Sequence, residues 1–190
     1  AGKRVLVTGA TGFIGGRLVE RLVLEEGAQV RALVRSLARA PRIARFDVEL
    51  VFGDILDREA TVRATQGCEV VFHCAWGDRR VNVEGTRNIL DAAVSATKVE
   101  RVVHLSTMMV YGDTPDGDLF ESAPRQRTGE EYDDSKLEGE KLALSYHRKH
   151  GLPVMVLQPT LVYGPWSPGS ITTLSLLKTG KVILVNAGQR

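Results

Sequence analysis

Two side chains of this sequence are spaced to carry acid–base chemistry. Tyr132 and Lys136 stand four residues apart in the segment YDDSK, and this spacing puts both on one face of a helix. A phenol has an ordinary pKa of about 10, so it exchanges protons poorly near neutral pH unless a neighbouring cation stabilises the phenolate. Lys136 is placed to supply that charge. The pair therefore predicts a phenol that donates or accepts a proton, although the same spacing also occurs on exposed helix surfaces.

A glycine-rich segment, TGATGFIG, follows an apolar run of strand type and opens a helical pattern. Gly9 permits a tight turn, Gly12 lets a pyrophosphate approach the backbone, and Gly15 lets the helix pack against the sheet. The N-terminus of that helix offers N–H groups and a favourable dipole to an anion. The segment therefore predicts a dinucleotide-binding turn. The other residues expected to bind the cofactor there are Thr11, Phe13 and Ile14.

The elements that would position these residues alternate between strand and helix. Strand-type runs cover 4–8, 28–34, 48–52, 70–74, 101–106 and 153–158, and helical patterns cover 17–26, 57–65, 81–96 and 130–150. This alternation predicts parallel pairing in an α/β fold with a Rossmann-type doubly wound sheet. The stretch 112–129 is long for a loop in a compact domain, which predicts a functional or mobile segment.

The composition excludes several classes of function. The chain has 190 residues, 25% of them charged, and a formal net charge of +2. This balance does not predict a nucleic-acid or membrane surface. Two cysteines, Cys68 and Cys74, fit neither a disulfide framework nor a metal cluster, so we expect no metal. The chain enters a strand within four residues and contains no apolar run of about 20 residues, so we expect a cytoplasmic protein without a membrane span.

The ordered series of motifs resembles the extended short-chain dehydrogenase/reductases, the NAD-dependent epimerase/dehydratase-like family. TGATGFIG, VNVEGTRN, HLSTMMVYG, YDDSK and PTLVYGP carry the resemblance, which covers nearly the whole chain. It implies hydride transfer between a nicotinamide and a carbon that bears a hydroxyl or ketone. The implied substrate is a nucleotide sugar, for epimerisation, or a ketone or aldehyde, for reduction. Met108 and Met109 stand where the family's dehydratases carry an acidic pair, which counts against dehydration.

The resemblance also implies roles for single residues. Tyr132 would be the acid–base group, and Lys136 would lower its pKa and hold the cofactor ribose. Thr107 would orient the reacting oxygen, with the neighbouring Ser106 as the alternative. Asn82 would be the structural asparagine that organises a water and the lysine. The remaining cofactor contacts implied are Asp54 and Ile55 at the adenine, Cys74 and Ala75 beside the ribose, and Pro159 beside the nicotinamide.

The end of the second strand bears on the choice of cofactor. NAD-binding members usually place a carboxylate there to bind the ribose hydroxyls. In this chain the segment VRALVR puts Val34 at that position and Arg35 after it. A guanidinium can grip a 2′-phosphate, so the sequence favours NADP over NAD. Two questions stay open. Arg35 could face water at the strand end and bind no phosphate, and the arginine-rich stretch that contains it could be a solvated turn or a phosphate site. That stretch contains Arg35, Arg39, Arg42 and Arg45.

The resemblance divides the chain into an NAD(P)-binding Rossmann domain, 1–165, and the start of a substrate-binding region, 166–190. Most of that region would be missing here, and the connection between Trp76 and Val81 is shorter than in the family. We expect a homodimer in which 81–96 and 130–150 form a four-helix bundle with their copies. Part of the reason is that Leu137, Leu142, Leu144 and Tyr146 offer more apolar surface than one sheet face can cover. An alternative function is a catalytically silent cofactor-sensing or interaction protein on the same fold.

Overall fold

The structure, a computed structural model, describes residues 2–113, 118–167, 169, 172, 175, 176 and 178–180. The chain forms two compact units, 1–160 and 161–190. The predicted boundary after residue 165 therefore lies inside the second unit, and the assignment of 166–190 to substrate binding stays a prediction. No helix within the described ranges is both long and apolar enough to cross a membrane.

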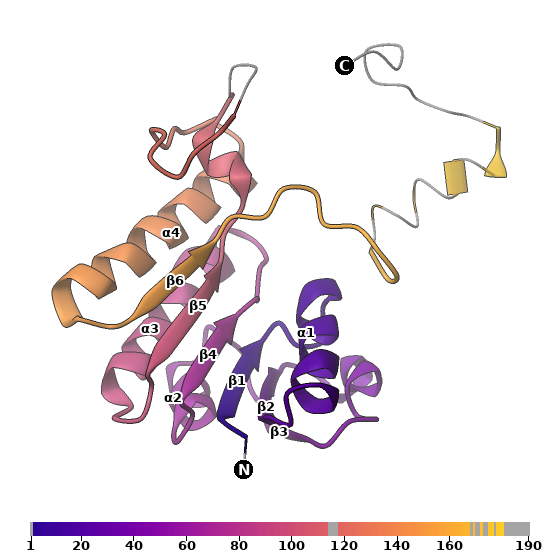
Figure 1. The fold of residues 1–190 in the computed structure, drawn as a ribbon, viewed down its shortest axis with the longest axis vertical. Coiled ribbons are helices and arrows are strands. Elements are labelled where there is room, and N and C mark those ends of the chain that lie inside the picture. Colours follow the sequence, from indigo (N-terminus) through magenta and orange to yellow (C-terminus); the bar gives the residue numbers. More distant parts are fainter. Residues whose placement is uncertain are drawn as a thin grey trace. The chain divides into compact units, whose positions relative to one another are not determined.

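The first unit is built on six parallel strands (Figure 1). The bounds are β1 (Arg4–Thr8), β2 (Gln29–Val34), β3 (Val48–Phe52), β4 (Val70–His73), β5 (Arg101–Leu105) and β6 (Val154–Leu157). Their order in the sheet is β3-β2-β1-β4-β5-β6. The chain thus moves outward from β1 in one direction and resumes at β4 in the other. The predicted doubly wound sheet is confirmed, and its switch point lies between the carboxyl ends of β1 and β4.

Two helical layers cover the sheet because its strands alternate their buried side chains between the two faces. On one face, Val5 and Val7 of β1 pack with Val19 of α1 (Phe13–Leu24). On the other face, Leu6 belongs to a core with residues of α2 (Arg58–Thr65), α3 (Thr86–Ser95) and α4 (Glu131–His150). Figure 1 shows α1 on one side of the sheet and the other three helices opposite. This packing holds the starts of α1 and α4 at the carboxyl edge.

Three elements differ from the prediction. Helix α1 begins at Phe13 and not at residue 17, so Gly15 and Gly16 belong to its first two turns. The predicted helix 81–96 contains a π-helical turn, Val81–Gly85, before α3. A short 3₁₀ helix, Leu37–Arg42, lies where a loop was expected.

The apolar residues that motivated the dimer are largely covered by their own chain. Leu137 is 1% exposed and Tyr146 is 8% exposed. Leu137 packs against Val110 and Tyr111, and Tyr146 joins the core beneath α3 and α4. The reasoning from surplus apolar surface was therefore wrong for these two residues, and the homodimer itself stays a prediction.

Candidate active site

The turn after β1 presses closely on the end of β4. Gly9 has a φ of 67°, and a Cβ there would lie 2.6 Å from the carbonyl oxygen of Cys74 and 2.7 Å from the nitrogen of Ala75. A Cβ on Gly15 would lie 2.3 Å from the carbonyl oxygen of Gly9. Side chains at either position would collide with backbone, so the glycines permit the tight turn and the close helix packing that the sequence predicts.

The start of α1 has the properties of an anion site. Gly12 caps the helix without a side-chain hydrogen bond to its N–H groups, and no acidic residue lies in the first turn. The Arg42 guanidinium donates to the Phe13 carbonyl oxygen at 3.3 Å, which brings a positive charge beside the turn. Thr11 and Ile14 lie half-buried in the same segment. The exposed glycine, the helix dipole and the guanidinium together fit a pyrophosphate.

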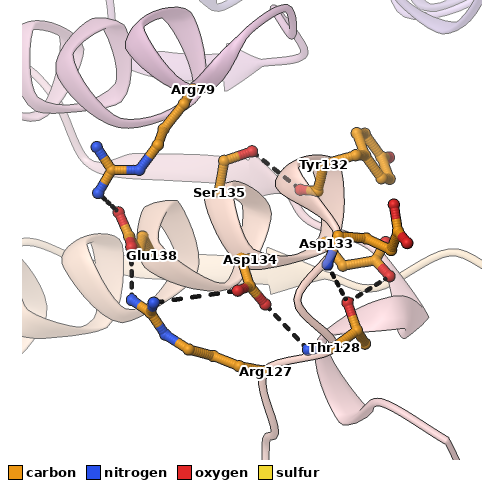
Figure 2. A network of polar contacts seen from close by, with 9 residues as sticks. Arg79, Arg127, Thr128, Tyr132, Asp133, Asp134, Ser135 and Glu138 are labelled. Atoms are coloured by element: carbon orange, nitrogen blue, oxygen red, sulfur yellow. Dashed lines mark hydrogen bonds and ion pairs between the residues drawn. The ribbon is translucent and has the colours of Figure 1, made fainter.

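The start of α4 is held from outside by two arginines that meet at one carboxylate. Arg79 and Arg127 each place a guanidinium nitrogen 2.6 Å from a carboxylate oxygen of Glu138 (Figure 2). Arg79 belongs to the short connection after β4, and Arg127 to the long loop that precedes α4. Both connections are therefore tied to the helix that carries the Tyr–Lys pair.

Thr128 fixes the first turn of α4 at closer range. Its N–H donates to Asp134 and its hydroxyl donates to Asp133, both at 3.0 Å (Figure 2). Carboxylates in the first helical turn also face the positive end of the helix dipole. These contacts set the position of Tyr132, which lies in the same turn.

The Tyr132 ring lies between a hydroxyl and an indole. The Thr107 hydroxyl, which follows β5, lies near enough to the Tyr132 phenol to lower its pKa. The Trp76 ring meets the Tyr132 ring edge-on, with 6.1 Å between centroids. Burial raises the pKa of the phenol above its ordinary value, the Thr107 hydroxyl opposes this rise, and the charge of Asp133 adds to it. The phenol therefore holds its proton at neutral pH.

Lys136 is buried one helical turn after Tyr132. Its ammonium donates to the carbonyl oxygen of Leu105, and its side chain reaches the site from within the helix–sheet interface. Burial lowers the pKa of Lys136 to about 8, against the raising effects of Cys74 and Glu140. The structure thus gives the ammonium a backbone partner, and the effect of Lys136 on the pKa of Tyr132 stays a prediction.

Two neighbouring hydroxyls at the end of β5 have different partners. The Ser106 hydroxyl donates to the carboxylate of Glu140 at 2.6 Å. The Thr107 hydroxyl accepts from the N–H of Met109 at 3.3 Å and lies near the Tyr132 phenol. Thr107 is thus the hydroxyl that the structure brings to the phenol.

Asn82 ties the short connection after β4 to α4. Its amide oxygen accepts from the N–H of Gly77, and its amide nitrogen donates to the Gly77 carbonyl and to Ser135. Ser135 in turn donates to the carbonyl oxygen of Tyr132 at 2.9 Å. Both amide hydrogens are therefore used. Asn82 thus holds the backbone at Gly77, and its implied role in organising a water and the lysine stays a prediction.

The remaining predicted cofactor residues follow other strands at the same edge. Arg35 lies 3.9 Å from the carboxylate of Asp54, whose other oxygen accepts from the N–H of Leu56. Ile55 is 6% exposed and packs in the core beneath α3. The Pro159 carbonyl oxygen, after β6, accepts from the N–H of Met108 at 3.1 Å.

Sequence reasoning left three residues of this region out of the site. Arg42 was part of the arginine-rich stretch, whose meaning stayed open. Trp76 was visible only as a neighbour of the strand end, and Glu140 gave no signal beyond its position one turn after Lys136. No cluster of three or more metal-ligating side chains lies among the residues that the structure describes.

The comparison with protein families decides what this arrangement belongs to. The model of the NAD dependent epimerase/dehydratase family matches residues 5–186. The chain belongs to this family. The resemblance inferred from the motifs is thereby confirmed.

Family members of known name include enzymes of different reaction types. A dTDP-glucose 4,6-dehydratase of Streptomyces niveus is 34% identical over 86% of this chain and 55% of its own. A 2-alkyl-3-oxoalkanoate reductase of Shewanella oneidensis is 33% identical over 94% of this chain and 50% of its own. A dTDP-glucose 4,6-dehydratase structure from Streptomyces venezuelae, with NAD bound, is 30% identical, with a TM-score of 0.82 over 95% of this chain and 63% of that chain. The chain thus spans about half the length of the curated relatives it matches.

Proposed function

We propose that this chain is the cofactor-binding part of an NAD(P)-dependent oxidoreductase or epimerase that acts by hydride transfer. The observation that carries the proposal is the placement of the Tyr132 phenol near the Thr107 hydroxyl, on the helix that also carries the buried Lys136 and at the sheet edge where the glycine turn follows β1. A proton-transfer group, an oxygen-orienting hydroxyl and an anion site at one edge are the parts such a reaction needs.

In this proposal the nicotinamide, when bound, supplies or accepts the hydride. The Thr107 hydroxyl orients the reacting oxygen of the substrate, and the Tyr132 phenol gives that oxygen a proton or takes one from it. The raised pKa of Tyr132 keeps the phenol protonated, which suits the donation that a reduction requires. Lys136 holds the cofactor ribose, and the turn from Gly9 to Gly15 holds the pyrophosphate.

NADP is the proposed cofactor. The end of β2 has Val34 where a carboxylate would favour NAD, and the exposed Arg35 follows it. Asp54 lies 3.9 Å from Arg35, a separation at which an exposed pair interacts weakly, so the guanidinium can turn to a phosphate. Arg42, whose guanidinium donates to the Phe13 carbonyl oxygen, adds a second positive charge beside the glycine turn.

The proposed substrate is a ketone or aldehyde, or else a nucleotide sugar. Trp76 is 69% exposed beside the phenol, and Met109 is 42% exposed just after Thr107. These apolar side chains support a carbonyl compound with an apolar body and favour reduction. A homodimer and a cytoplasmic location remain predictions of the same proposal.

Tyr132→Phe tests the proposal. We expect turnover to fall by about a hundredfold or more, the usual contribution of a positioned acid–base group, while cofactor binding is retained. The assay is a panel of ketones, aldehydes and nucleotide sugars, with nicotinamide absorbance for turnover and fluorescence titration for binding. Tyr146→Phe is the matched control, because that phenol lies on the same helix but bonds to Asp91. Turnover that survives Tyr132→Phe, or a protein that binds cofactor but turns over nothing, would contradict the catalytic assignment.

A further inference from the structure

A carboxylate lies inside the molecule one helical turn beyond Lys136. Glu140 of α4 is 0% exposed and faces the ends of β5 and β6. It accepts from the Ser106 hydroxyl at 2.6 Å and from the side-chain amide of Gln158 at 2.9 and 3.0 Å. The guanidinium of Arg125, which belongs to the long loop before α4, also donates to it. Every donor comes from a different segment, so Glu140 joins the loop and two strand ends to the catalytic helix.

A buried carboxylate is costly unless it is paired, and an apolar pair of similar shape is often no less stable. Packing alone therefore gives a weak reason for a charge at this position. Besides the Arg125 guanidinium that contacts it, a second cation near Glu140 is the buried ammonium of Lys136, which lies four residues earlier on the same helix and whose pKa Glu140 raises.

The other groups around Lys136 do not balance its charge. The Lys136 ammonium lies near His73 of β4, near Cys74, which follows β4, and near His104 of β5. Burial raises the pKa of the Cys74 thiol to about 11 and lowers the pKa of His73 to about 3, so both are neutral near pH 7. Burial also lowers the pKa of His104, which is neutral too. Glu140 is thus the anion that acts on the ammonium from within the helix–sheet interface.

We propose that Glu140 is a positioning residue of the active site, whose carboxylate holds Ser106 away from the phenol, anchors the loop through Arg125 and keeps the buried Lys136 ammonium charged. This inference rests on the proposed function, because it assigns Lys136 a task that needs its charge. Glu140 touches neither the substrate nor the cofactor in this proposal. It acts through the groups that do.

The test is the pKa of Lys136, measured by NMR of isotope-labelled lysine side chains over a pH titration. The Lys136 signal is assigned by its loss in Lys136→Met. In Glu140→Gln we expect the pKa of Lys136 to fall by about one unit, the effect of removing an opposite charge at this range. An unchanged pKa would overturn the proposal.

Two variants separate charge from packing. Ser106→Ala removes a hydrogen bond to Glu140 but keeps its charge, so the pKa of Lys136 should stay at the wild-type value. Glu140→Asp restores the charge and should bring the pKa back toward it. A pKa in Glu140→Asp as low as in Glu140→Gln would show that the charge is not the cause.

The double variant Glu140→Gln/Arg125→Gln covers the case in which the single variant does not fold, because it leaves no unpaired guanidinium behind. A smaller fall in the pKa of Lys136 is expected there, because the positive charge of Arg125 is removed as well, and a value at or above that of Arg125→Gln alone would overturn the proposal. The titration needs neither substrate nor turnover. A failure of the Tyr132→Phe experiment is therefore distinguishable from a failure of this one.

Discussion

Low pH should lower the stability of this fold, because one buried histidine cannot accept a proton in its folded surroundings. His73, at the end of β4, is 2% exposed, and its Nδ1 and Nε2 each lie 2.8 Å from a threonine hydroxyl, Thr8 and Thr86 respectively. Thr86 donates its own proton to the carbonyl oxygen of Asn82, so it accepts from Nε2. Nδ1 therefore accepts from Thr8, which in turn accepts from the N–H of Ala75. A second proton on the ring would break this chain of bonds.

The size of the effect follows from the pKa of His73. Burial, with a smaller contribution from the charge of Lys136, lowers this pKa from 6.5 to about 3. Between these two values the unfolded chain binds a proton that the folded chain does not, so stability falls as the pH falls. For this site alone the free energy of unfolding should drop by about 2 kcal/mol between about pH 7.5 and about pH 5. The pKa of His104 is lowered in the same direction and adds to the drop.

The assay is urea unfolding followed by circular dichroism across this pH range. His73→Gln removes the titrating group and should reduce the drop by about 2 kcal/mol. His150→Gln is the matched control, because it removes an exposed histidine from the last turn of α4 and leaves the buried ring of His73 in place. An equal drop in the wild type and in His73→Gln would refute the reasoning, as would an NMR titration that shows His73 gaining a proton near pH 6.5.

Two further predictions concern the cofactor and the reacting oxygen. Arg35→Ala should weaken binding of NADP by about tenfold and leave NAD binding nearly unchanged. Only NADP has a 2′-phosphate, so only NADP loses a charge-assisted hydrogen bond. Fluorescence titration of both cofactors measures this, with Arg58→Ala as an exposed control, and an unchanged NADP preference would contradict it. Thr107→Ala should lower turnover by about tenfold or more, whereas Ser106→Ala should lower it far less, since only the Thr107 hydroxyl meets the phenol. Steady-state kinetics of both variants decides, and a larger loss in Ser106→Ala would reverse the assignment.

The sequence by itself determined the features that depend on local spacing. The glycines at Gly9 and Gly15 follow from backbone sterics within a few residues. The alternation of apolar runs predicts the parallel sheet, because strand and helix periods are properties of the chain itself. Since parallel strands end at a common edge, the sequence also predicts that the glycine turn lies at the edge where the helix with Tyr132 and Lys136 begins.

Only the tertiary structure decided which partners these side chains have. Ser106 and Thr107 are neighbours of similar chemistry, and a carboxylate 34 residues away from Ser106 separates their roles. Asn82 binds the backbone at Gly77, and the Lys136 ammonium donates to the carbonyl oxygen of Leu105 in β5. Hydrogen bonds and pKa values depend on burial and on groups from distant segments, which no local pattern encodes. The motifs therefore predicted the chemistry of the site, and the packing of α4 against the sheet decided which groups each side chain contacts.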